Sequence, residues 1–317
     1  MSPRALITGG AGFIGSHIAD ALLDRGYQVV VLDDLSTGRR ANVPAGAELL
    51  TLDVRSTDAA RVVRDGGFDV VFHQAAQIDV RKSVADPVAD ASINVLGALN
   101  VLEAVRAAKR RPRVVFSSTG GAIYGDFVTP PNVEDYAKDP ESPYGIAKLA
   151  VEHYLAYYGR QHGLESVVLR YANVYGPRQD PQGEAGVVAI FCNRLLDGKP
   201  LTVFGDGRQT RDYVHVKDVA AANAAAATVA LPPAGRLDVR AMNVGTGIET
   251  DVLTLAETLR RVSGRDVAID FAPTRPGEQL RSAVETGKIR RLLGWTPQRS
   301  LADGLRETYD YFAATRG

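Results

Sequence analysis

Short runs of apolar residues alternate, over the first half of the chain, with longer segments in which apolar positions recur every three or four residues. The short runs predict buried strands, and the longer segments predict amphipathic helices. Strands are expected at 6–7, 29–32, 48–52, 70–72, 114–116 and 167–169, and helices from about residues 13, 95 and 143. This alternation predicts an α/β fold with a doubly wound parallel sheet, whose ligands lie at the carboxyl ends of the strands.

The rhythm changes after Tyr175, where prolines and glycines crowd residues 177–186 and predict a loop. Beyond it, we expect a helix through Ile190 and Leu195, strands at 201–204 and 267–269, an alanine-rich helix from Val219 and a last helix over about 301–312. Residues 1–174 are therefore expected to form the sheet domain, with about 212–245 returning to it. Residues 175–317 are expected to form a smaller mixed α/β region.

The composition of the chain limits the kinds of binding partner and the cellular location that we expect. The 317 residues include 37 Lys and Arg against 37 Asp and Glu, and this zero net charge disfavours nucleic acid or an anionic membrane as partner. No uncharged apolar run approaches the roughly 20 residues that cross a bilayer, and the N-terminus lacks a secretory pattern. A single cysteine, Cys192, excludes an intrachain disulfide. We expect a reduced, cytoplasmic protein.

A glycine-rich segment, TGGAGFIG at 8–15, lies between the first expected strand and the first expected helix. Glycines there allow a tight turn and the close approach of a pyrophosphate to a helix N-terminus, although a purely structural turn would have the same pattern. Asp33 follows the second strand, where a carboxylate can bind the adenosine ribose, and Asp34 disfavours a 2′-phosphate. Asp53, after the third strand, could bind the adenine amino group or serve only as a turn residue. The pattern predicts NAD rather than NADP.

Tyr144 and Lys148 are four residues apart at the start of the long expected helix, so their side chains share one face. A tyrosine has a pKa of about 10 and becomes a useful base only when a nearby cation stabilises its phenolate. Such spacing also arises by chance in structural helices. Ser117, Ser118 and Thr119, however, place hydroxyls at the end of the fifth strand, where a site of this fold would lie.

Together these segments resemble the extended short-chain dehydrogenase/reductase family and, within it, the bacterial UDP-glucose 4-epimerases. The matching segments occur in the family's order at 8–17, 73–76 (HQAA), 117–125 (SSTGGAIYG), 144–148, 170–179 (RYANVYGPRQ), 205–218 (GDGRQTRDYVHVKD) and 275–278 (RPGE). The resemblance implies an NAD-binding Rossmann domain over 1–174 and a substrate-binding region over 175–317. It further implies an isomerase that inverts C4 of a UDP-hexose through a 4-keto sugar, and a homodimer formed through paired helices. The segments near 95–108 and 143–162 are the candidates for this interface, although their apolar faces could equally pack internally.

The resemblance also implies residue roles. Tyr144 would be the base, Lys148 would tune it, and Thr119 would bind the reacting hydroxyl. Ser118 is the fourth expected catalytic residue. The implied NAD contacts are Gly9, Gly12, Phe13, Ile14, Gly15, Asp33, Asp34, Leu35, Thr37, Gly38, Asp53, Val54, Gln74, Ala75, Ala76, Asn94, Ser117, Tyr144, Lys148 and Tyr171. The implied substrate contacts are Gln77, Ser83, Thr119, Asn173, Val188, Val203, Arg211, Arg275 and Ser282. Arg211 and Arg275 suit a diphosphate because a guanidinium forms bidentate bonds, although either could instead form a surface ion pair. The five histidines show no metal-ligand spacing, so no metal is expected.

Four alternatives remain open. Sugar-nucleotide dehydratases and decarboxylases of the family carry carboxylates just after the position of Thr119, where this chain has Gly120 and Gly121, which favours an epimerase. Relatives that act on UDP-glucuronate often have Thr in place of Asn173, which weakly disfavours a uronate. Ser282 falls where hexose-restricted epimerases have a bulky tyrosine, so UDP-N-acetylhexosamines are expected as further substrates. A non-catalytic NAD-binding sensor would commonly lack the tyrosine or the lysine, and this chain has both.

Overall fold

The computed structural model describes residues 2–181, 186–274 and 279–316 of the chain. Within these residues, seven strands form one central sheet in which every neighbouring pair is parallel. Their order across the sheet is β11 (Ala241–Val244), β6 (Ser166–Tyr171), β5 (Arg113–Thr119), β4 (Val70–His73), β1 (Arg4–Thr8), β2 (Gln28–Asp33) and β3 (Ala47–Thr51). Because the strand order reverses between β1 and β4, the predicted doubly wound α/β fold is confirmed.

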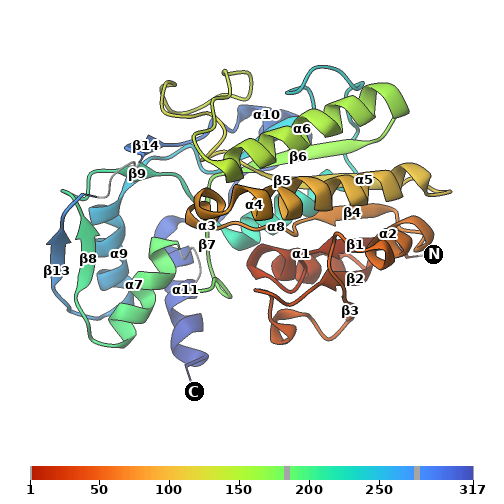
Figure 1. Ribbon diagram of the computed structural model, residues 1–317. Helices are drawn as coiled ribbons and strands as arrows, with labels where there is room; N and C mark the ends of the chain where they lie inside the picture. Colours follow the sequence, from red (N-terminus) through yellow and green to blue (C-terminus); the bar gives the residue numbers. More distant parts are fainter. Residues whose placement is uncertain (1, 182–185, 275–278, 317) are drawn as a thin grey trace.

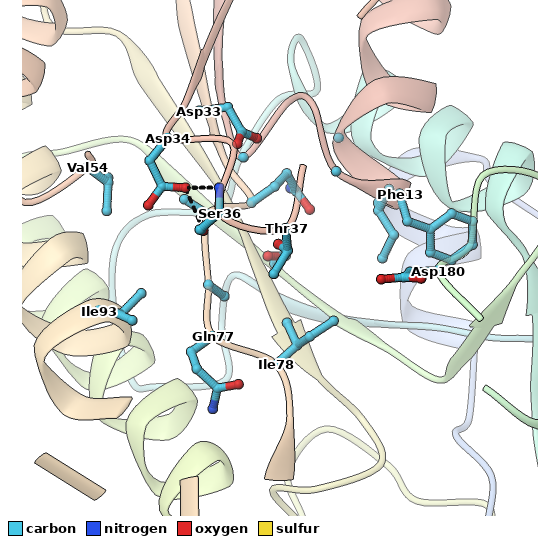
Figure 2. A pocket seen from close by; sticks show the side chains of 18 of the residues that line it. Phe13, Asp33, Asp34, Ser36, Thr37, Val54, Gln77, Ile78, Ile93 and Asp180 are labelled. Carbon is cyan, nitrogen blue, oxygen red and sulfur yellow. Dashed lines mark hydrogen bonds between the residues drawn. The ribbon is translucent and has the colours of Figure 1, made fainter. Parts of the chain in front are cut away.

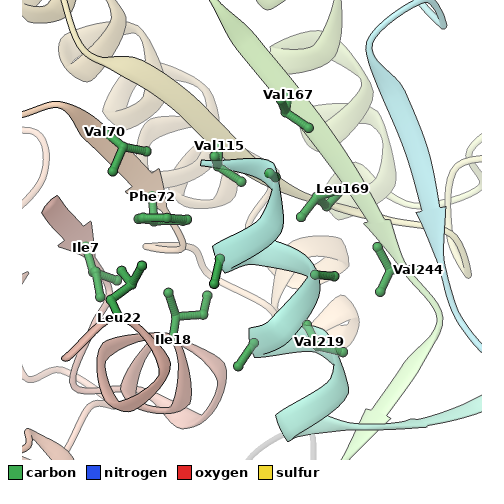
Figure 3. Close-up of a cluster of buried hydrophobic side chains, with 14 of the residues drawn as sticks. Ile7, Ile18, Leu22, Val70, Phe72, Val115, Val167, Leu169, Val219 and Val244 are labelled. Carbon is green, nitrogen blue, oxygen red and sulfur yellow. The ribbon is translucent and has the colours of Figure 1, made fainter. Parts of the chain in front are cut away.

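Helices cover both faces of this sheet (Figure 1). Successive strand residues point to opposite faces, so Ile7 packs in the cluster beneath one helical layer and Leu6 in the cluster beneath the other. Figure 3 shows the first cluster, where Ile18 and Val219 meet side chains of the central strands. The first layer contains α1 (Phe13–Leu23) and α8 (Val216–Ala226). The second contains α2 (Thr57–Asp65), α5 (Gly97–Ala107) and α6 (Pro143–His162), with the short α3 (Val80–Ala85), α4 (Pro87–Ala91) and η2 (Ser92–Leu96) packed against α6 or α5.

A smaller region lies beside the sheet domain and has a core of its own (Figure 1). This core is built from α7 (Val187–Leu196), α9 (Val252–Ser263), α11 (Leu301–Ala314) and the parallel pair β8 (Leu201–Phe204) and β13 (Ile269–Ala272). Short strands complete the region: β7 (Asn173–Tyr175) pairs with β10 (Tyr213–His215), and β9 (Thr210–Arg211) lies between β12 (Thr250–Asp251) and β14 (Arg281–Ser282). The remaining helices are η1 (Arg40–Asn42) and α10 (Gly287–Leu293), and α10 contacts β11 and α8 of the sheet domain.

The chain returns to the sheet domain after entering the smaller region, since α8 packs on α1 and β11 pairs with β6. Most strands differ from the expected bounds by one to three residues at an end, and α8 begins at Val216 rather than Val219. The strand β13 is shifted as a whole and covers Ile269–Ala272 rather than 267–269. β13 is displaced because its register is fixed by pairing with β8, which local hydrophobicity does not reveal.

One helical run meets the length and composition criteria for a membrane span, which was not expected of any segment from the sequence. The continuous run Pro87–Ala107 has a mean hydropathy of 1.4 and is long and apolar enough to cross a membrane by length and composition alone. It was not recognised from the sequence because Asp90 and Glu103 interrupt it. Three side chains of this run, Val101, Leu102 and Val105, are buried in the core between α5 and the sheet. This burial is typical of a helix that covers a sheet.

Candidate functional site at the carboxyl ends of the strands

A cavity of about 370 Å³ opens at the carboxyl ends of β1, β2, β4 and β5, around the point where the strand order reverses (Figure 2). Parallel α/β sheets bind their ligands at this place. The predicted NAD contacts that line the cavity are Gly9, Gly12, Phe13, Ile14, Gly15, Asp33, Asp34, Thr37, Asp53, Val54, Gln74, Ala75, Ala76, Ser117, Tyr144, Lys148 and Tyr171. Three predicted contacts lie outside the lining. Leu35 donates its N–H to Asp33, Gly38 lies against the Asp33 carboxylate, and buried Asn94 bonds Gln77 and Asp90.

The glycine-rich turn leaves room for a ligand at the start of α1. Gly9 has φ +70°, and a Cβ built on it would lie 2.6 Å from the Ala75 nitrogen, so only glycine fits there. Gly12 is the N-cap of α1 and supplies no side-chain bond to the first N–H groups of the helix. An uncapped helix N-terminus attracts anions, because its N–H groups and the helix dipole both favour negative charge. The turn therefore fits a pyrophosphate.

Carboxylates define the other end of the cavity. The two oxygens of Asp33 accept the backbone N–H groups of Ala11 and Leu35, which orients this buried side chain, and burial raises the pKa of its carboxyl group. Asp34 accepts both the N–H and the hydroxyl of Ser36, as the dashed lines in Figure 2 mark. Two carboxylates in this position favour ribose hydroxyls over a 2′-phosphate, so the residues present fit NAD.

Asp53 is already paired. Both of its oxygens accept from the Arg55 guanidinium, and these hydrogen bonds are the main cause that lowers the pKa of the Asp53 carboxyl group. The Asp53 carboxylate therefore forms an ion pair at the cavity wall. This arrangement is compatible with both roles that the sequence left open, a turn residue and an adenine contact.

α6 brings Tyr144 and Lys148 into the same cavity. The helix starts where it does because the Ser142 side chain caps it, accepting the Gly145 N–H, and Pro143 suits the first helical position. Lys148 is 4% exposed, and its Nζ donates to the Ser117 carbonyl at 3.0 Å and lies 5.8 Å from the centre of the Tyr144 ring. Burial lowers the pKa of Lys148 to about 8, although Asp90 and Glu152 oppose this change. A buried cation beside a phenol is the arrangement that stabilises a phenolate.

The hydroxyls at the end of β5 differ in their partners. Ser117 donates to the His73 carbonyl, Ser118 donates to Glu152 at 2.5 Å, and the Thr119 Oγ1 accepts the Ala122 N–H at 3.1 Å. Of the three, Ser117 and Ser118 line the cavity, and Thr119 lies beside it. Glu152 was not identified from the sequence, although its position eight residues after Tyr144, on the same helix face, was a usable signal.

The predicted substrate contacts are spread over two regions. Gln77 lines the cavity, buried Ser83 donates its hydroxyl to the Val80 carbonyl, and Asn173 is exposed on β7. Arg211 and Ser282 are paired neighbours on β9 and β14. Val188 and Val203 are buried in the core of the smaller region and do not line the cavity. Arg275 lies outside the described residues.

Sequence reasoning missed several polar residues of the cavity. Arg178, Gln179 and Asp180 line it, and Arg178 forms an ion pair with Asp20 of α1. Arg178 and Gln179 belong to the family-like segment 170–179, and residues 177–186 were expected to form a loop, but none of these three residues was given a role. Arg39 and Lys82 belong to the same lining, where Arg39 forms an ion pair with Asp180.

Comparisons with known proteins agree with this geometry. The model of the NAD dependent epimerase/dehydratase family matches residues 5–245. A UDP-glucose 4-epimerase of Mycolicibacterium smegmatis is 43% identical, over 98% of each chain. The crystal structure of a UDP-glucose 4-epimerase from Thermotoga maritima with UDP-glucose has a TM-score of 0.92 and 43% identity, covering 99% of this chain and 100% of the other. That of a Thermus thermophilus UDP-glucose 4-epimerase with NAD has a TM-score of 0.89 and 45% identity, covering 98% and 99%.

Proposed function

Because the chain belongs to the NAD-dependent epimerase/dehydratase family, as its motifs predicted, we propose that it is a UDP-glucose 4-epimerase that interconverts UDP-glucose and UDP-galactose. NAD is its cofactor, as in the similar Thermus structure and in the family. One observation carries the proposal: a single cavity joins a turn that fits a pyrophosphate, carboxylates that fit an adenosine ribose, and the pair Tyr144 and Lys148.

The chemistry assigns a task to each side chain. NAD, held by the glycine-rich turn and the carboxylates at Asp33 and Asp34, would supply the hydride acceptor for C4 of the sugar and the hydride donor for the 4-keto sugar. Tyr144 takes the proton of the C4 hydroxyl as the hydride leaves and later gives it back to the 4-keto sugar. Lys148 stabilises the phenolate as long as it is protonated, and its bond to the Ser117 carbonyl holds Nζ in place. Because the same proton returns, the reaction needs no further acid or base.

The glycines after Thr119 support an epimerase over a dehydratase or decarboxylase. A Cβ built on Gly120 would lie 2.7 Å from the Val284 side chain and 3.2 Å from the Arg170 carbonyl, so a carboxylate side chain at that position would require the Val284 side chain to move. Gly121 has more room and supplies no functional group. The extra proton-transfer groups that those reactions require are absent from these two positions.

The small side chain of Ser282 supports a second substrate class, UDP-N-acetylhexosamines. Ser282 is buried, and a Cβ built on Gly121 would lie 3.8 Å from its Oγ and 4.0 Å from the Thr119 Oγ1. Three small residues thus lie next to one another beside the position where the resemblance expects the sugar. A tyrosine at 282 would occupy far more volume than the serine, so the serine is expected to leave more room for an acyl substituent.

The proposal includes a homodimer in the cytoplasm that binds neither nucleic acid nor a membrane. η2 and α6 pack against each other, and large apolar side chains remain exposed on them, namely Leu96, Ile146, Tyr154 and Tyr157. Exposed apolar groups that cluster on neighbouring helices are typical of a subunit interface. Light scattering coupled to size-exclusion chromatography tests the dimer, and a Leu96→Asp variant should shift the protein towards the monomer.

The function is tested by proton NMR of the purified, NAD-loaded protein with UDP-galactose, following the anomeric signals with time. We expect the signal of UDP-glucose to grow. The matched control is Tyr144→Phe, which removes one hydroxyl and should lower the rate about 10²- to 10⁴-fold while NAD stays bound. A wild-type protein that binds NAD and leaves UDP-galactose unchanged would refute the assignment of this substrate, and equal activity of Tyr144→Phe would refute the role of Tyr144.

A further inference from the structure

A buried ion pair lies directly behind the cavity wall that Ser118 forms. Glu152 on α6 and Arg170 on β6 both have side chains that are 0% exposed. The Arg170 Nη2 donates to Glu152 Oε2 at 2.6 Å, and its Nε lies 3.1 Å from Oε1. Ser118 and Arg170 are paired neighbours on β5 and β6, so the sheet brings the hydroxyl and the guanidinium to the same carboxylate.

This pairing determines the charge of Glu152. A guanidinium keeps its proton at every physiological pH, and a bidentate contact with it holds a carboxylate in the ionised form. An ionised carboxylate can only accept hydrogen bonds. The Ser118 hydroxyl, 2.5 Å from Glu152 Oε1, must therefore be the donor in this bond.

The direction of that bond decides what Ser118 offers to a ligand. Its only proton is committed to Glu152, so towards the cavity Ser118 presents lone pairs. Thr119 is the opposite case, because its Oγ1 accepts the Ala122 N–H and keeps its own proton to donate. Adjacent residues thus supply one acceptor and one donor.

We propose that Glu152, held by Arg170, is a positioning residue that orients the Ser118 hydroxyl as a hydrogen-bond acceptor for a hydroxyl of the bound hexose next to the reacting carbon. The inference rests on the proposed function and deepens it, since it assigns a hydrogen-bond direction within the sugar site. Ser118 then fixes the ring while the C4 hydroxyl remains free to give its proton to Tyr144.

Glu152 is not the sole carboxylate that neutralises the charge of Arg170. Its Nη2 also contacts Asp238 at 2.7 Å, and its Nη1 donates to the Tyr124 hydroxyl and the Glu134 carbonyl. A Glu152→Gln variant therefore leaves the guanidinium with a carboxylate partner. In that variant the amide oxygen takes the place of Oε2 and keeps the bond from the Arg170 Nη2. The NH₂ group takes the place of Oε1, where it loses the weaker contact with the Arg170 Nε and donates to Ser118, which turns the Ser118 proton towards the cavity.

A double-mutant cycle tests the inference with NAD-loaded protein and UDP-galactose. Glu152→Gln should lower kcat about 10- to 100-fold with a much smaller change in KM, because the nucleotide dominates binding and the orientation of the ring governs the reaction. In a Ser118→Ala background the same substitution should change kcat less than about twofold. Equal losses of kcat in the two backgrounds would overturn the inference, since Glu152 would then act without Ser118.

Two further variants separate positioning from general damage to the fold. Asp238→Asn weakens the other carboxylate contact of Arg170 without touching Ser118, so it should lower the Tm and leave kcat within about twofold. If Glu152→Gln does not fold, Arg170→Lys takes its place, because an ammonium keeps the charge but loses the bidentate grip on Glu152. It should lower kcat in a Ser118-dependent way, and a Ser118-independent loss would overturn the inference. A wild-type enzyme without epimerase activity would instead refute the proposed function and the inference with it.

Discussion

The alkaline side of the activity profile should report the protonation of Lys148. This lysine is fully enclosed, and burial lowers its pKa from the ordinary 10.5 to about 8. Because the protonated form stabilises the Tyr144 phenolate, activity should fall as the pH rises through 8. With a pKa of 8, about nine-tenths of the lysine is protonated at pH 7 and about one-tenth at pH 9, so kcat should fall about tenfold between these values.

The stability of the fold should change in the opposite direction. Below pH 8, holding a charged lysine in this environment costs about 3 kcal/mol relative to the unfolded chain, since each pKa unit corresponds to about 1.4 kcal/mol. That cost decreases as the pH rises from 8 towards 10.5, because the native lysine loses its proton before the unfolded one does. Deprotonation of Lys148 between pH 8 and 10.5 therefore does not destabilise the fold, so it cannot lower the activity in this range by unfolding the protein.

Two lysine variants make the assay decisive. Lys148→Arg keeps its positive charge throughout pH 6–10, so this variant, although slower, should lose the decline near pH 8. Lys138→Arg is the matched control, because Lys138 lies outside the cavity and burial lowers its pKa as well, and the decline should persist in this variant. Rates would be measured by acid quench and chromatography of UDP-galactose and UDP-glucose, with no coupling enzymes. A decline near pH 8 that survives in Lys148→Arg refutes the assignment to Lys148.

Three further outcomes are expected. Ser282→Tyr should lower kcat/KM for UDP-N-acetylgalactosamine about 100-fold and leave that for UDP-galactose within a few fold, as a direct comparison of the two substrates would show; retained N-acetylhexosamine activity would contradict the space argument. Gly15→Ala places a Cβ 2.8 Å from the Gly10 Cα, so thermal unfolding should show a loss of about 1–3 kcal/mol together with weaker NAD binding, and an unchanged Tm would speak against a close-packed turn. In Asp33→Asn, the new NH₂ group must face one of the two backbone N–H groups that the carboxylate accepts. Calorimetry on the NAD-free protein should therefore show about 10- to 100-fold weaker NAD binding and a smaller preference for NAD over NADP. Unchanged NAD affinity would refute the role of Asp33 in binding the ribose.

Local features of the sequence were sufficient to predict the sheet domain and to identify the candidate catalytic pair, Tyr144 and Lys148. The doubly wound sheet follows from the alternation of apolar strands and amphipathic helices, since each element is defined by the spacing of a few neighbouring residues. The turn at 8–15 and the pair Tyr144 and Lys148 are also local patterns. The structure places both of them at one cavity, because parallel strands end at the same edge of the sheet.

Long-range packing decided the rest. Ser118, Glu152 and Arg170 lie on three different elements, and only the register of β5 with β6 and the packing of α6 bring them to one carboxylate. Val188 and Val203 occur in segments with no distinguishing local pattern, and only the core of the smaller region places them away from the cavity. The sequence by itself determined which elements form and which residues can do chemistry, because those properties depend on near neighbours. The tertiary structure decided which distant side chains form hydrogen bonds with one another, since that depends on how whole elements pack.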